Sequence, residues 1–230
     1  MAADKNIIVS ITDYVVEQND CRLGPLDLSI AAGEFLVIDT EFPEHASFLL
    51  RTLATLVRPL QGTYRFMGTP LRFSNYQDIL EYKKRIGYLS AGIGMISNRT
   101  IMSNLLLPRY YAENSLSLAL APETENLCER FGLTGRLLRQ VTDATNWDLR
   151  TATIIRELMK HPDLLLVERP EEMVPPGTRT VLVDILQQAI ADGKPVILFS
   201  RDRKFLERLS PTGRVEITGG MCCKNCPDRL

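Results

Sequence analysis

Two apolar strands separated by one helix constrain the fold of this chain more than any other feature. The segments "DLLLVE" (163–168) and "PVILFS" (195–200) are continuous apolar runs. Between them, "TRTVLVDILQQAIADG" (178–193) has the spacing of an amphipathic helix that ends at Gly193. Strands without alternation are typical of parallel sheets covered on both faces. Strand, helix and parallel strand form a βαβ unit, which predicts an α/β domain.

The first third of the chain predicts a separate antiparallel β portion. The runs "NIIVSI", "LDLSI" and "FLVI" are divided by turn residues, and "GTYRFMGTPL" has the pattern of a strand with a glycine turn. A helix follows "EFLVI" directly, beginning near His45 or Ala46. After a short strand in "KKRIGYLS", residues 100–160 have helical spacing. We expect one domain over residues 1–220 with an inserted helical subdomain at about 100–160.

Composition excludes several classes of function. The chain has 230 residues, with 27 basic and 28 acidic side chains and a formal net charge of -1. No overall field therefore attracts nucleic acid or an anionic membrane surface. No uncharged apolar run approaches the ~18 residues of a spanning helix, and the N-terminus has no leader pattern. We expect a cytoplasmic protein that binds no nucleic acid and does not insert into a membrane.

Three cysteines near the C-terminus form a candidate metal site. Cys222, Cys223 and Cys226 lie together in "MCCKNCPDRL". A closed zinc site takes four ligands, and neither histidine is near in sequence. We therefore expect no metal and a flexible tail over residues 221–230. Cys21 and Cys128 are expected to be buried thiols.

Six fragments in a fixed order indicate a family. They are "AAGEFLVI", "LLRTLATLVRPLQGTYRFMGTPL", "RIGYLS", "SNLLLP", "RELMKHPDLLLVERP" and "GKPVILFSRD". Their order and intervals resemble the nucleotide-binding domain of ATP-binding cassette (ABC) transporters from about residue 7 to 220. The resemblance implies a P-loop NTPase core with an N-terminal antiparallel β portion and a helical subdomain. The family's activity is ATP hydrolysis.

The phosphate-binding positions of this family are filled by unsuitable residues. A phosphate loop has the pattern G-x-x-x-x-G-K-[ST], in which glycines and lysine contact phosphates and the hydroxyl binds magnesium. In register, these positions hold Thr40, His45, Ala46 and Ser47, so that only the hydroxyl is kept. The turn "DTEFPEHAS" adds three carboxylates and a proline. We expect neither ATP nor magnesium to bind.

The remaining motifs of the resemblance are also altered. Glu168 replaces the magnesium-orienting aspartate, and Arg169 replaces the catalytic glutamate and cannot accept a proton. Ala91 stands at the glutamine that senses the γ phosphate, and Arg201 at the switch histidine. The signature segment falls at 144–148, "ATNWD", where Trp147 is too bulky for a backbone that must approach phosphate. Tyr14 aligns with an adenine-stacking aromatic, although packing is its simpler role.

These substitutions predict a non-catalytic cassette subunit, a pseudo-ATPase, in an ABC transporter complex. The resemblance implies a permease as partner, with an intact cassette or a second copy, and a peripheral position at the inner face of the membrane. "SNRTIMSNLLLP" is similar to cassettes of lipid or lipoprotein transport. The groove that receives the permease would use Met95, Ile96, Leu105, Pro108 and Tyr110, unless these form the core of the subdomain. The alternatives are a soluble scaffold and a weak ATP-dependent enzyme.

Overall fold

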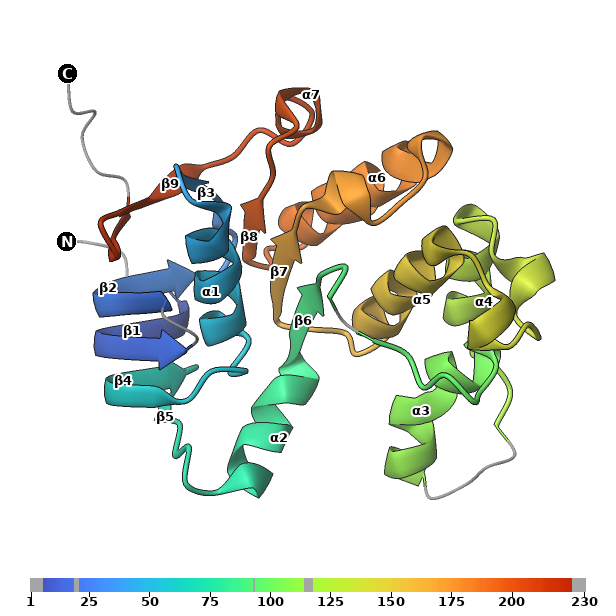
Figure 1. The fold of residues 1–230 in the computed structure, drawn as a ribbon, viewed down its shortest axis with the longest axis horizontal. Coiled ribbons are helices and arrows are strands. Elements are labelled where there is room, and N and C mark those ends of the chain that lie inside the picture. The colour runs from blue at the N-terminus through green and yellow to red at the C-terminus, as the bar shows by residue number, and fades with distance from the viewer. Residues whose placement is uncertain (1–5, 19–20, 93, 114–117, 225–230) are drawn as a thin grey trace.

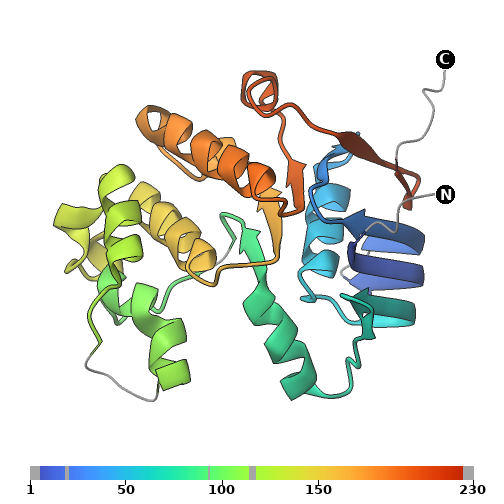
Figure 2. The ribbon, with the colours of Figure 1, turned by 180° about the vertical axis from the view of Figure 1, so that it is seen from behind.

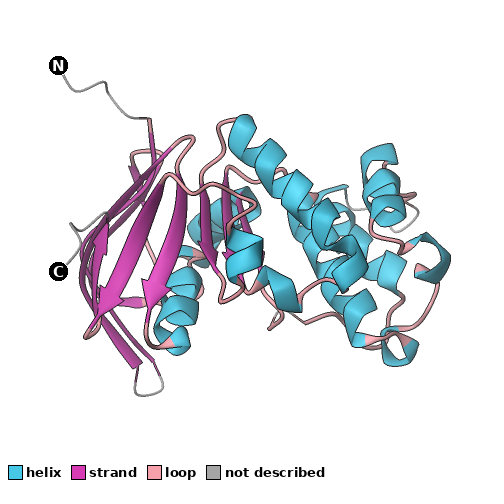
Figure 3. Ribbon diagram, turned by 90° about the horizontal axis from the view of Figure 1, so that it is seen from above, coloured by secondary structure: helices cyan, strands magenta, loops and turns pink. Residues whose placement is uncertain are grey.

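The chain folds into two β-sheets and a helical lobe (Figure 1). This computed structural model describes residues 6–18, 21–92, 94–113 and 118–224. The sheets lie on one side of the molecule, and a group of helices forms the other side (Figure 2). The view from above separates the strands and the helical lobe along the long axis (Figure 3).

The first sheet is the antiparallel β portion that the sequence predicts. Its strands are β1 (Ile7–Gln18), β2 (Cys21–Ala31), β4 (Pro59–Phe66) and β5 (Thr69–Pro70), in the order β2-β1-β4-β5. β1 pairs antiparallel with both β2 and β4. Its inward side chains, including Val9, Ile11 and Tyr14, are buried, as the apolar runs require.

The second sheet is the core of the α/β fold. It contains β3 (Phe35–Thr40), β6 (Ile86–Leu89), β7 (Leu164–Glu168), β8 (Val196–Phe199), β9 (Gly213–Thr218) and β10 (Met221–Lys224). Their order is β10-β9-β3-β8-β7-β6. All neighbours pair in parallel except β9 and β10. The prediction that "EFLVI", "DLLLVE" and "PVILFS" share one sheet is confirmed, and every residue of β7 and β8 is buried.

Helix α1 (Pro43–Leu53) joins the two sheets. Its buried residues belong to one apolar cluster with β1, β2, β4 and the core strands. The helix begins at Pro43, earlier than the expected start near His45, because proline is well suited to the first helical position. Helix α2 (Tyr76–Arg85) was not anticipated; Asn75 caps it by accepting a hydrogen bond from the N–H of Gln77.

The remaining helices form the helical lobe and pack with it against the core sheet. The lobe contains α3 (Ile101–Glu113), α4 (Pro122–Arg130) and α5 (Asn146–Leu158), with short 3-10 turns at Thr134–Arg136 and Val141–Asp143. After β7 come two more 3-10 turns, Pro170–Glu172 and Pro176–Thr178, and then α6 (Arg179–Ala191) and α7 (Arg203–Leu206). A second apolar cluster joins the lobe and α6 to the core sheet.

The prediction of a flexible tail over residues 221–230 is wrong for its first four residues. Met221–Lys224 form β10, which pairs with β9, and residues 225–230, with Cys226, lie outside the described residues. Cys222 packs against the core, and burial raises its pKa to about 12. Cys128 is fully buried, as expected, whereas Cys21 is only partly buried. Within the described residues no group of His, Cys, Asp and Glu side chains could hold a metal ion.

Candidate functional site

The turn between β3 and α1 is too short to form a phosphate loop. β3 ends at Thr40 and α1 begins at Pro43, so only Glu41 and Phe42 lie between them. The phosphate-loop pattern needs four loop residues here, but the last two, Pro43 and Glu44, are already helical. Thr40 closes the turn, since its Oγ1 accepts the N–H of Phe42 at 3.3 Å. The N–H of Phe42, in the middle of the turn, is therefore already bonded within the chain.

Ala46, at the lysine position, points into the protein interior. It has 0% exposure and belongs to the apolar cluster between the two sheets. The helix register that follows from the early start at Pro43 therefore buries this position instead of directing it toward a ligand. His45, in place of the second glycine, stacks near Phe42, with ring centroids 5.3 Å apart.

Glu168 lies at the centre of a hydroxyl network at the end of β7. Its carboxylate accepts hydrogen bonds from Ser47 Oγ at 2.5 Å, Tyr88 Oη at 2.5 Å and Ser90 Oγ at 2.9 Å. Ser47 comes from α1, while Tyr88 and Ser90 come from the β6 segment, which pairs with β7. Both Glu168 and Tyr88 are 6% exposed. Three elements of the core, α1, the β6 segment and β7, thus meet at one buried carboxylate.

The network keeps Glu168 ionised. Burial alone would raise its pKa, but the hydrogen bonds of Ser47, Tyr88 and Ser90 and the nearby charge of Arg169 together lower it below its ordinary value. Burial and the charge of Glu168 raise the pKa of Tyr88, so its hydroxyl stays a donor. Sequence analysis missed Tyr88 and Ser90. Their alternate positions in "GYLS", on one face of a strand beside β7, are the signal that could have identified them.

Arg169 occupies the base position as a fixed cation. Its backbone is left-handed, with φ 44°, and its guanidinium lies 3.7 Å from Glu168 Oε1 and 3.3 Å from Glu172 Oε1. An open cavity of about 540 Å³ lies beside it. The cavity is lined by Ser47, Arg51, Leu56, Tyr88, Ser90, Ala91, Gly92, Glu168 and Arg169. Four of the six motif positions expected from the sequence therefore line this cavity, namely Ser47, Ala91, Glu168 and Arg169, whereas Ala46 is buried in the core.

Arg201, like Ala46, does not line this cavity. It is exposed, and its backbone N–H donates to Glu171 Oε1 at 3.4 Å. The same carboxylate accepts the hydroxyl of Ser200 at 2.7 Å. These contacts order the loop after β8.

The signature position forms a self-capped helix terminus. Thr145 and Asp148 make a capping box at the start of α5: each side chain accepts the other's backbone N–H at 3.2 Å. Arg136 donates to Asp148 at 2.6 Å, and Asp148 is 1% exposed. Burial would raise the pKa of Asp148, but these hydrogen bonds hold it below its usual range. The backbone N–H groups of Thr145 and Asp148 at this terminus are thus satisfied within the chain.

Two aromatic residues of the expected motifs behave differently from each other. Tyr14 has 0% exposure and packs on Tyr64 and Phe73, with ring centroids at 6.1 and 6.5 Å, so packing is its role. Trp147 is 39% exposed on the first turn of α5, and the guanidinium of Arg150 lies 5.8 Å from its ring. Trp147 is therefore available at the surface.

The residues expected to contact a partner divide into core and surface. Leu105 was wrongly placed at the surface: it is 4% exposed in the lobe core, because it faces α5 from α3. Met95 also packs against this core. Ile96 is 42% exposed, Pro108 is exposed and Tyr110 is partly exposed. Asn104, missed from the sequence, holds the backbone of Ile96 by hydrogen bonds of 2.7 and 3.1 Å.

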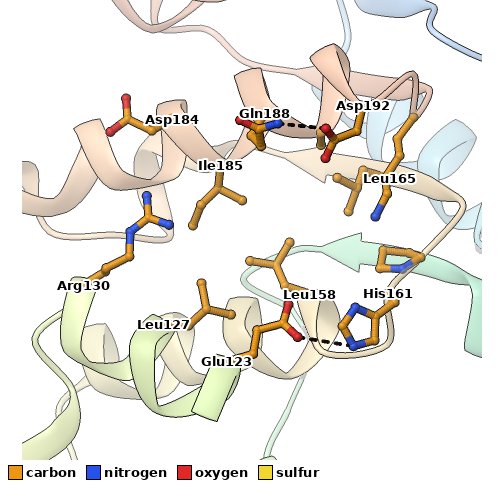
Figure 4. Close-up of a pocket in the computed structure, with 13 residues that line it drawn as sticks. Glu123, Leu127, Arg130, Leu158, His161, Leu165, Asp184, Ile185, Gln188 and Asp192 are labelled. Carbon is orange, nitrogen blue, oxygen red and sulfur yellow. Dashed lines mark hydrogen bonds and ion pairs between the residues drawn. The ribbon is translucent and has the colours of Figure 1, made fainter. Parts of the chain in front are cut away.

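A separate cleft of about 330 Å³ lies between α4, the end of α5 and α6 (Figure 4). Its floor is apolar, with Leu127, Leu158 and Ile185, and its rim carries charges of both signs. Glu123 and His161 approach to 3.6 Å across its lower edge. None of the vestigial positions lines this cleft, so it is distinct from the site around Glu168.

Comparison with solved structures identifies the architecture. A dimeric structure of the ATP-binding cassette MJ0796 bound to ADP and Pi matches with a TM-score of 0.78 over 96% of this chain and 100% of that chain, at 16% identity. A nucleotide-free ATP-binding cassette from an ABC transporter matches with a TM-score of 0.72, covering 95% of this chain and 90% of that chain, at 14% identity. The chain has the fold of an ATP-binding cassette.

Sequence comparison finds relatives that are ATP-binding/permease proteins. The pyoverdine export ATP-binding/permease protein PvdT of Pseudomonas fluorescens is 25% identical over 87% of this chain, and the macrolide export ATP-binding/permease protein MacB of Nitrosomonas europaea is 26% identical over 77%. The chain spans 30% and 27% of the lengths of these two relatives. No protein-family model matches the chain. The relatives and the solved structures together support a relationship with the ATP-binding cassettes of ABC transporters.

Among the described helices of this chain, none is long and apolar enough to cross a membrane.

Proposed function

We propose that this cassette is a non-catalytic subunit that supports an ABC transporter complex without hydrolysing ATP. The observation that carries the proposal is the hydrogen bond between Ser47 and Glu168. In P-loop ATPases the corresponding hydroxyl and acid bind magnesium. In this cassette they bind each other, and two further hydroxyls donate to the same carboxylate. Magnesium would have to displace a satisfied, buried network.

The surroundings of Glu168 support the same proposal. Arg169 stands where a base would activate water, and a guanidinium stays protonated in proteins. Ala91, at the position of the γ-phosphate sensor, has only a methyl group. With the short turn before α1, the motif positions supply neither a glycine-rich phosphate loop nor its lysine nor a general base.

A calorimetric titration with Mg-ATP tests whether the protein binds and hydrolyses ATP. We expect no binding tighter than about 100 μM, roughly 5.5 kcal/mol, and no phosphate release. An intact cassette measured in parallel provides the positive control. Tight binding with turnover would favour the weak ATP-dependent enzyme instead.

We further propose a permease as the partner and a position at the inner face of the membrane. The names of the relatives, ATP-binding/permease proteins, support a permease. Ile96, Pro108 and Tyr110 are the members of the expected contact set that remain accessible. An intact cassette or a second copy would complete the assembly, and a lipid-related cargo stays a prediction.

Co-purification with a candidate permease tests the partner. Ile96→Asp and Tyr110→Asp should each reduce recovery of the permease, because a carboxylate would be buried at the contact. Tyr76→Asp is the matched control, since Tyr76 is 65% exposed on α2. Failure of the unchanged cassette to recover any permease would favour the soluble scaffold. Equal recovery by all variants would place the contact elsewhere.

A further inference from the structure

Two opposite charges lie unpaired at one end of the cleft between α4 and α6. Arg130, the last residue of α4, and Asp184, on α6, both line the cleft at this end (Figure 4). Both residues are exposed, and neither side chain forms an ion pair or a hydrogen bond with any residue that the structure describes. A guanidinium and a carboxylate are therefore available to a molecule in the cleft.

The polar groups at the other end of the cleft are bound to each other. Glu123, at the start of α4, lies 3.6 Å from His161, and the side-chain amide of Gln188 donates to Asp192 at 2.8 Å (Figure 4). At about 1.5 Å per residue, this end lies roughly 10 Å along α4 from its last residue. The two ends are thus distinct, and the unpaired charges belong to one of them.

The apolar floor begins directly beside the unpaired charges. Leu127 is 9% exposed and lies one helical turn before Arg130, while Ile185 follows Asp184 on α6. Leu158, from the end of α5, continues the floor toward the other end (Figure 4). The volume of about 330 Å³ is near the lower limit of ligand sites, which is about 300 Å³. The cleft therefore suits a small molecule with a charged group next to an apolar chain.

The two unpaired charges decide which charged group fits. A ligand with only a cation would be repelled by Arg130, and one with only an anion by Asp184. A ligand that carries both satisfies both, because its carboxylate can bind the guanidinium through two hydrogen bonds and its ammonium can donate to the aspartate. Lys194 also lines the cleft, and its charge is offset by that of Asp192. An α-amino acid has a carboxylate, an ammonium and a side chain on one carbon.

We propose that this cleft binds a free α-amino acid with a large apolar side chain. Arg130 holds its carboxylate, Asp184 holds its ammonium, and the floor receives its side chain. α4 belongs to the helical lobe, and residues of α4, α6 and the core sheet share one apolar cluster. The ligand would therefore contact the lobe and α6 together, which gives a chain without ATP hydrolysis a means to respond to a metabolite. This inference goes beyond the proposed function and requires neither ATP nor a permease.

NMR titration of the full chain with L-leucine and three analogues tests the class of ligand. Isocaproate lacks the ammonium group, isoamylamine lacks the carboxylate, and glycine lacks the apolar side chain. We expect L-leucine to bind with a dissociation constant below about 1 mM and each analogue to bind at least tenfold more weakly. The resonances that shift should be those of residues around the cleft.

Substitutions at the two charges test the position of the ligand. Arg130→Gln and Asp184→Asn should each weaken L-leucine at least tenfold. Arg139→Gln and Asp143→Asn are the matched controls, because both residues are exposed outside the cleft, and they should leave the affinity unchanged. Thermal unfolding of each variant checks that the fold is kept.

The analogues also separate the roles of the two charges. Arg130→Gln should not weaken isoamylamine, which has no carboxylate to lose a partner. Asp184→Asn, for the same reason, should not weaken isocaproate, which has no ammonium. A loss of both analogues in both variants would show that the substitutions disturb the cleft in general, and would overturn the assigned roles.

Three other outcomes would overturn the proposal. The first is no binding of L-leucine at about 10 mM, well above the expected dissociation constant. The second is an affinity for isocaproate, isoamylamine or glycine equal to that for L-leucine. The third is an effect of Arg130→Gln or Asp184→Asn no larger than that of its control. None of these outcomes bears on ATP binding or on recovery of a permease, so the two proposals are tested separately.

Discussion

Ser47 Oγ lies 2.5 Å from Glu168 Oε1, and this contact joins the first half of α1 to the end of β7. Both side chains stand at positions that hold magnesium in P-loop ATPases. In this structure the two side chains bind each other, so each polar group has a partner in a largely buried region. The network therefore has a structural role that can be measured independently of ATP.

Replacing Glu168 by Leu should strongly destabilise the protein. The hydroxyls of Ser47, Tyr88 and Ser90 would lose their acceptor in a buried region, and each unsatisfied group costs about 1–3 kcal/mol. We expect a loss above about 3 kcal/mol in the free energy of unfolding, measured with a chemical denaturant. Glu168→Gln keeps an acceptor and should cost less. Equal effects of the two substitutions would contradict the role of the network.

The pH dependence of stability should differ between the unchanged protein and Glu168→Gln. The pKa of Glu168 is lowered in the folded state, so its contribution is fully present above the unfolded pKa of about 4.5. It is lost as the pH falls through the lower, folded pKa. The stability difference between the two proteins should therefore be constant near neutral pH and shrink below about pH 4.5. Denaturation curves at several pH values measure this, and a constant difference down to pH 3 would show that Glu168 is not held ionised.

Tyr88→Phe tests a single bond of the network. It removes the hydroxyl that donates to Glu168 and leaves the ring in place. Hydrogen bonds to charged groups contribute about 1.5–3 kcal/mol, and we expect a loss in this range. Tyr76→Phe is the matched control, because Tyr76 is 65% exposed and should lose almost nothing. A similar small effect at both positions would argue against the bond.

The sequence predicts the strands and helices of the fold better than the hydrogen-bond network around Glu168, for a physical reason. Apolar patterning predicts β3, β7 and β8 and the helix before Gly193, because burial imposes a continuous apolar run on these strands and a helical period on the helix, each visible within one segment. The network around Glu168 instead depends on Tyr88 and Ser90, which are distant in sequence and adjacent only through the pairing of β6 with β7. Whether Leu105 is buried likewise depends on how α3 packs on α5.

Asp148→Ala should remove the cap of α5. The substitution breaks the reciprocal bonds with Thr145 and the ion pair with Arg136, at a position that is 1% exposed. Loss of a cap costs about 0.5–2 kcal/mol, and we expect the upper part of this range in chemical denaturation. Asp143→Ala, at an exposed aspartate in the same stretch, serves as the control and should change stability by less than about 0.5 kcal/mol.

Ala46→Lys should destabilise the protein without creating a nucleotide site. Ala46 has 0% exposure between the two sheets, so the longer side chain would be forced into a packed interior and its charge would lose water. We expect a loss of at least about 2 kcal/mol in unfolding free energy and no heat of binding with Mg-ATP. Thr63→Lys, on an exposed position of β4, adds the same charge at little cost. If Ala46→Lys were as stable as this control and bound Mg-ATP, then α1 would have to begin later than Pro43, and the short turn would not be the barrier to phosphate binding.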